Sequence, residues 1–159
     1  MSTNEIHNNI KAESIIRPDE ICLDVWNSRS SKHQAINYKI VYGLLATYSN
    51  HNCIFCNQTN ETTEHIFLEC VRLTEIRNEI SNWLDLLRAD AVMDRDLIIL
   101  NKGISSDLER LILSEYKIVI WLARNKMKYE NIPCNTAKML NQIEEKVRFY
   151  LMHYANGIT

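Results

Sequence analysis

Apolar residues recur along much of the chain about every 3.6 positions, which is the period of an α-helix. From about Lys32 to Tyr48 they cover most of a helix circumference, and we expect this helix near the centre of the fold. A second helix is predicted from Thr62 or Thr63 to about Leu87. Its apolar stripe consists of Ile66, Leu73, Ile76, Ile80, Trp83, Leu84 and Leu87.

The second half of the chain predicts two more helices with clear ends. Ser106-Asp107-Leu108-Glu109 is a capping box, which opens a helix from about Asp107 to Glu130. Asn131-Ile132-Pro133 ends this helix, and a last helix runs from Thr136 to Ala155 before Asn156-Gly157. Residues 89–105 leave two options open, because the apolar run Leu97–Leu100 suits either a short helix or an extended segment.

Composition favours one mainly α domain. The 159 residues include only three glycines and two prolines, which argues for long helices in a bundle. Residues 1–16 are predicted to form a flexible polar tail, and Arg17-Pro18-Asp19-Glu20 is typical of a helix start, so the domain is expected to span residues 17–159. No signal peptide and no apolar run of the roughly 18 residues that a membrane span needs is present. Five cysteines, an odd number, favour a reducing environment. We therefore expect an intracellular protein, nuclear or cytoplasmic, with no membrane partner.

Four metal-ligand residues lie within eighteen positions. Cys53 and Cys56 form a Cys-x2-Cys pair, and His65 and Cys70 follow. Four such ligands close a tetrahedron around Zn²⁺ and leave no open position, so we predict one structural zinc ion. Because His65 and Cys70 are about 140° apart on an ideal helix, we expect a bend or loosened turn between them. The alternative is a set of buried free cysteines beside a solvated histidine.

Two motifs resemble a known family. Glu-Thr-x-Glu-His-x-Phe-x-x-Cys after a Cys-x2-Cys pair is similar to the zinc-binding segment at the C-terminal end of non-LTR (LINE-type) retrotransposon reverse transcriptases. Here this segment is Glu61–Cys70. The run Ile120–Asn125 resembles the Ile-Trp-x-x-Arg-Asn helix that follows in that family. The resemblance implies an accessory domain that helps grip template RNA or target DNA, with the rest of a reverse transcriptase as partner.

The long helix carries a second candidate site. Its predicted core stripe consists of Leu108, Leu111, Ile112, Ile118, Val119, Leu122 and Tyr129. On the opposite side four cations surround a tryptophan and no acid interrupts them. We expect this side to contact nucleic acid through Arg110, Lys117, Trp121, Arg124 and Lys128. The alternative is a solvated helix face whose Trp121 packs on the N-terminal helix.

Catalytic residues are not expected. A polymerase needs carboxylates that hold two metal ions, and neither these nor a convincing nuclease constellation around Asp19 occurs. Cys22 and Cys134 stand without a histidine base and are expected to be buried structural thiols. We therefore predict no enzyme and no small-molecule substrate. Two functions remain open: a nucleic-acid-binding accessory domain, and a protein-interaction or scaffold module in which zinc only holds two helices together.

Overall fold

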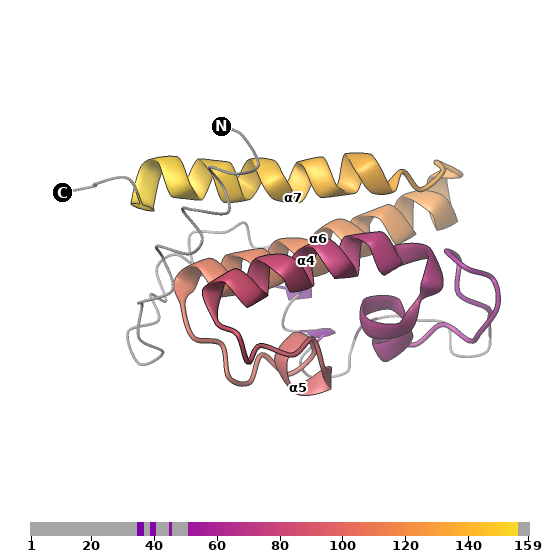
Figure 1. Cartoon of the computed structure of the whole chain (residues 1–159). Coiled ribbons are helices and arrows are strands. Elements are labelled where there is room, and N and C mark those ends of the chain that lie inside the picture. The colour runs from indigo at the N-terminus through magenta and orange to yellow at the C-terminus, as the bar shows by residue number, and fades with distance from the viewer. Residues whose placement is uncertain (1–34, 37–38, 41–44, 46–50, 156–159) are drawn as a thin grey trace.

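The computed structural model of the chain describes residues 35, 36, 39, 40, 45 and 51–155 (Figure 1). Within these residues the architecture is helical, and extended backbone pairs only at an isolated antiparallel bridge between Asn52 and Asn60. The prediction of a mainly α fold is therefore confirmed. The elements in chain order are η3 (His65–Glu69), η4 (Val71–Leu73), α4 (Thr74–Leu87), α5 (Arg95–Ile98), α6 (Asp107–Glu130), α7 (Thr136–Tyr150) and η5 (Leu151–Ala155).

Three long helices form the body of the structure. α4, α6 and α7 contact one another pairwise, and η3 and α5 lie below them in the view of Figure 1. α6 is enclosed on all sides over its first four turns, since every residue from 106 to 121 except Arg110 is buried. The helix predicted to be central, Lys32–Tyr48, lies largely outside the described residues, although its Ile36, Ile40 and Leu45 are buried. The predicted helix start at Arg17 lies outside them altogether.

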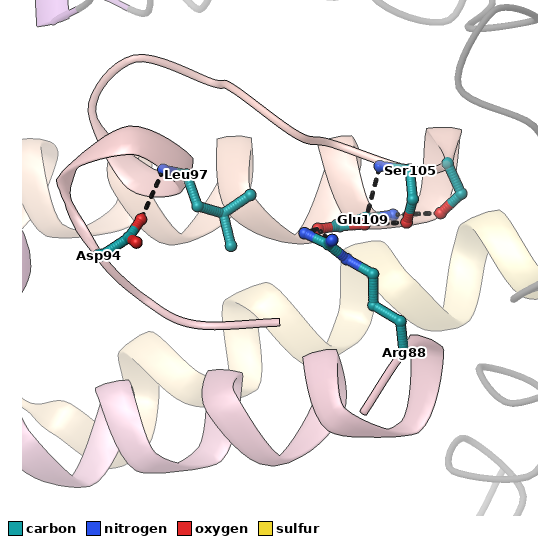
Figure 2. A network of polar contacts seen from close by, with 6 residues as sticks. Arg88, Asp94, Leu97, Ser105 and Glu109 are labelled. Carbon is teal, nitrogen blue, oxygen red and sulfur yellow. Dashed lines mark hydrogen bonds and ion pairs between the residues drawn. The ribbon is translucent and has the colours of Figure 1, made fainter. Parts of the chain in front are cut away.

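The ends of α6 agree with the sequence prediction. Ser106 caps the helix, because its Oγ accepts a hydrogen bond from the backbone N–H of Glu109 at 3.1 Å. The Glu109 carboxylate in turn accepts from the N–H and hydroxyl of Ser105, one residue earlier than in a standard capping box. Arg88, just beyond α4, completes this network (Figure 2). At the other end Asn131 adopts a left-handed conformation, φ 56° and ψ 29°, which ends the helix.

The predicted helix from Thr62 to Leu87 is interrupted at Cys70. The π-helical turn η3 precedes this residue and the 3₁₀ turn η4 follows it, while Cys70 itself is extended at φ −60° and ψ 121°. The helix nevertheless ends at Leu87 as predicted, and all seven residues of its apolar stripe are buried. The interruption therefore changes the direction of the chain without removing any residue from the core.

The remaining elements resolve open points. Residues 95–98 form the short helix α5, which Asp94 caps through Leu97 N–H at 3.0 Å (Figure 2). The last helix reaches Ala155 as predicted, but its final residues form the π-helical turn η5. The prediction that Tyr129 is a core residue is wrong. It lies near the end of α6, beyond the helices that cover the rest of α6, and is 64% exposed. None of the described helices has the length and apolar character that crossing a membrane requires.

Candidate metal centre

The first ligand pair lies on a tight loop between residues 51 and 61. Backbone hydrogen bonds close the loop from Cys53 N to Thr59 O at 2.7 Å and from Glu61 N to His51 O at 2.9 Å. Inside it, Asn57 N donates to Cys53 O at 2.8 Å, and Asn57 has a positive φ of 55°. Asparagine tolerates this conformation better than most residues. The local sequence therefore folds Cys53 and Cys56 back toward each other.

The second ligand pair depends on the π-helical turn. Cys70 N donates to His65 O at 2.8 Å, which is the i to i+5 hydrogen bond of a π-helix. The wider turn accommodates one more residue than an α-helical turn, so residues five apart come back to nearly the same side. The prediction that a loosened turn separates His65 from Cys70 is thus confirmed.

The four predicted ligands come together. The ligand atoms of Cys53, Cys56, His65 and Cys70 all lie within 4.8 Å of one another, and the group can hold one metal ion. Sγ of Cys53 is 3.9 Å from Sγ of Cys70, and Sγ of Cys56 is 3.3 Å from Nε2 of His65. Tetrahedral coordination with ordinary zinc bond lengths requires about 3.8 Å between two sulfurs and about 3.5 Å between sulfur and nitrogen. The donor set and its spacing therefore fit such an ion.

Two threonines orient the histidine. The Thr59 hydroxyl lies 3.0 Å from Nδ1 and 3.2 Å from Nε2 of His65, while Thr62 Oγ1 accepts from the His65 backbone N–H at 3.0 Å. When Nδ1 carries the proton and donates it to Thr59, Nε2 keeps its lone pair for a metal. Such outer hydrogen bonds fix the tautomer and orientation of a ligating imidazole.

The two buried thiols form a hydrogen bond, with their sulfurs 3.9 Å apart. The hydrogen bond from Cys70 lowers the pKa of Cys53 to about 5, which makes it a thiolate near neutral pH. The same hydrogen bond, together with burial, raises the pKa of Cys70. A bound dication favours the loss of this remaining proton, because only the thiolate is a good ligand.

Side chains from α4 and α6 support the bend at Cys70. Arg77 Nη1 donates to the Cys70 carbonyl at 2.7 Å, and the Tyr116 hydroxyl donates to the Phe67 carbonyl. Carbonyls at the end of a helical turn need partners outside the turn, and these two side chains supply them. Burial raises the pKa of Tyr116, so it stays a neutral donor. Its ring also packs edge-on against Phe67, with the ring centroids 6.5 Å apart.

A buried ion pair attaches the loop to α6. Arg124 Nη2 lies 2.6 Å from Glu61 Oε1 and Nε lies 3.3 Å from Oε2, so the contact is bidentate. The two side chains are only 1% and 3% exposed. Glu61 belongs to the motif that carries His65, and Arg124 belongs to the Ile120–Asn125 motif. Sequence reasoning treated the two motifs separately and missed that they meet.

Three of the five residues of the predicted cationic face are buried. Lys117, Arg124 and Trp121 are 0%, 1% and 7% exposed, and only Arg110 and Lys128 are half-buried. Lys117 Nζ donates to Asn101 Oδ1 at 2.8 Å inside the fold. Both interpretations of this face expected Lys117 and Arg124 to be exposed, and the structure buries them, because neighbouring elements cover α6 on its polar side as well. The burial of Trp121 agrees with the packed tryptophan of the second interpretation.

The other candidate residues do not join the centre. Cys134 is half-buried in the connection between α6 and α7, where its thiol lies 3.5 Å from Met139 Sδ. Burial raises the pKa of this thiol, in agreement with a structural role. His51 is exposed and contributes its backbone carbonyl to the loop. Cys22 and Asp19 lie outside the described residues.

Comparison with known proteins adds no family. A scan against protein-family models, a search of curated proteins and a search of solved structures each found no match to this chain. What the fold and the site establish together is a mainly helical chain with a Cys3His cluster able to hold one metal ion.

Proposed function

We propose that this chain is a zinc-binding helical module in which the metal is structural. The observation that carries the proposal is the convergence of three cysteine sulfurs and one histidine nitrogen within 4.8 Å. Thiolate and imidazole ligands in a tetrahedral arrangement favour Zn²⁺ over the hard cations Mg²⁺ and Ca²⁺. Four protein ligands leave no coordination position for a substrate. The ion would hold the loop of residues 51–61 against η3.

A scaffold role is the better supported of the two candidate functions. The metal would join two chain segments that both pack on α6. This is a structural role that needs no bound partner molecule. The nucleic-acid role rests on the resemblance to LINE-type reverse transcriptases, in which such a segment is an accessory to the polymerase. Burial of Lys117, Trp121 and Arg124 gives no support to a nucleic-acid contact through these three side chains. We therefore infer a scaffold module in which the metal holds two chain segments together, with the nucleic-acid-binding accessory domain as the alternative.

Metal analysis of matched cysteine variants tests this proposal. The full chain should bind one equivalent of zinc, and Cys56→Ser should lose it. Cys134→Ser is the matched control, because Cys134 is equally half-buried but lies outside the cluster. Full zinc content in Cys56→Ser, or none in the parent chain refolded with zinc, would contradict the proposal. A gel shift at several salt concentrations separates the two functions: salt-sensitive retention of RNA or DNA would favour the nucleic-acid role.

A further inference from the structure

α6 carries an anchor for each half of the metal site. Tyr116 holds the half that contains His65 and Cys70, through the carbonyl of Phe67. Arg124 holds the half that contains Cys53 and Cys56, through the carboxylate of Glu61. The two anchors are eight residues apart, which corresponds to about 12 Å along the helix axis. One rigid helix therefore sets the separation of the two ligand pairs.

The contacts of Arg124 fix both the position and the orientation of its guanidinium group. Its guanidinium binds both carboxylate oxygens of Glu61, which fixes the direction of approach as well as the distance. The guanidinium carbon lies 4.6 Å from the centroid of the Trp121 ring, and Nη1 donates to Asn125 Oδ1 at 2.9 Å. A lysine cannot reproduce this planar, stacked and bidentate arrangement. Trp121 and Asn125 thus position the Arg124 guanidinium from within α6, independently of its contact with the loop.

Glu61 transmits this position to the ligands. Its backbone N–H donates to His51 O across the loop, and the neighbouring bridge pairs Asn52 with Asn60. These contacts align the segment that leads into Cys53. Glu61 also stands between Thr59 and Thr62, the two residues whose hydroxyls contact His65. A shift of Glu61 would therefore move both the cysteine loop and the groups that orient the imidazole.

We propose that Arg124 is a positioning residue of the metal centre, and that its ion pair with Glu61 pre-organises the site for metal. The inference rests on the proposed zinc function and deepens it. Because the pair holds the loop in its metal-binding shape, metal binding and the ion pair stabilise each other, and the coupling is reciprocal. Loss of the pair lowers metal affinity even where the fold survives.

Metal affinity of the full chain tests the proposal. Zn²⁺ affinity is measured by competition with a chelator, and Co²⁺ serves as a spectroscopic probe of tetrahedral thiolate coordination. Arg124→Gln and Glu61→Gln should each weaken zinc binding by about 10-fold, the low end of the range for groups bonded directly to a ligand, because both residues act on the ligands through the loop. Both should also alter the Co²⁺ ligand-field bands. The double variant should recover part of the affinity, since neither side chain then leaves an unpaired buried charge.

Arg88→Gln is the matched control. It breaks a second ion pair with a buried carboxylate, that of Glu109, at the opposite end of α6 (Figure 2). This variant should lose stability and keep the parent's zinc affinity and Co²⁺ spectrum. If Arg124→Gln does not fold, Arg124→Lys and Glu61→Gln decide the question, and folded variants with parental affinity overturn the inference. So does an equal loss of affinity in Arg88→Gln. Failure of the parent chain itself to bind zinc would instead refute the proposed function.

Discussion

Replacing Lys117 by methionine should stabilise the protein at acidic pH and not at alkaline pH. Lys117 is completely buried on α6, where its amine has a hydrogen bond to Asn101 Oδ1. Burial, followed by the nearby Arg110, lowers the pKa of the amine from 10.5 to about 7. Methionine has a similar length and shape but no charge, so it keeps the packing and removes the charged group.

The magnitude follows from linkage between protonation and folding. Because the folded-state pKa is the lower one, the unfolded chain binds more protons between pH 7 and 10.5, and stability rises with pH across that window. At about 1.4 kcal/mol per pH unit, the charged lysine costs the folded state up to about 5 kcal/mol below pH 7. The lost hydrogen bond to Asn101 offsets about 1 kcal/mol of the gain. We expect Lys117→Met to gain about 4 kcal/mol at pH 6. At pH 10, still below the unfolded-state pKa of 10.5, the remaining cost of the lysine is about 1 kcal/mol and cancels the lost hydrogen bond, so the variant should match the parent within about 0.5 kcal/mol.

Urea unfolding, monitored by the circular dichroism of the helices in zinc-containing buffers from pH 6 to 10, measures the stability difference between Lys117→Met and the parent. Lys126→Met is the control, because Lys126 is exposed on the same helix. It should change stability by less than about 0.5 kcal/mol at every pH. A difference between Lys117→Met and the parent that stays constant with pH, or a loss of stability at pH 6, would refute the reasoning.

Two further predictions concern the core and the metal. Trp83→Ala should cost about 3–5 kcal/mol in urea unfolding. Trp83→Phe should cost clearly less, since Nε1 is buried and has no hydrogen-bond partner among the described residues; equal losses would contradict this account. Removal of metal by a chelator should speed hydrogen exchange in residues 51–73 and lower the melting temperature while α6 and α7 stay protected, as hydrogen-exchange mass spectrometry can show. Unchanged exchange in this segment would mean that the metal does not hold it.

Local signals explain what the sequence predicted well. The bounds of α6, Asp107–Glu130, follow from a cap at one end and a helix-breaking segment at the other, and both act over a few residues. The ligand set could also be predicted from the sequence, because the spacing of a Cys-x2-Cys pair and a nearby histidine and cysteine is typical of a zinc site. The angle of about 140° between His65 and Cys70 on an ideal helix predicted a loosened turn between them. It did not predict that this turn is π-helical.

Long-range packing explains what the sequence did not reveal. A helical wheel places Lys117, Trp121 and Arg124 on one side of α6, but it does not say what covers that side. The partner of Arg124 is Glu61, 63 positions earlier in the chain, and neither residue alone signals the other. Charged residues are rarely buried unless they are paired, so exposure was the natural expectation for this face. The prediction for Tyr129 was wrong for the opposite reason, because the apolar stripe of α6 continues past the part of the helix that other elements cover.

X-ray absorption at the zinc edge tests the central claim most directly. The full chain with one equivalent of zinc should show three sulfur neighbours at about 2.3 Å and one nitrogen at about 2.0–2.1 Å. The nitrogen shell should carry the multiple scattering of an imidazole, as His65 requires. Cys70→Ser should reduce the sulfur shell to two neighbours or abolish binding. A shell of oxygen and nitrogen donors alone, or a parent spectrum unchanged in Cys70→Ser, would contradict a centre built from Cys53, Cys56, His65 and Cys70.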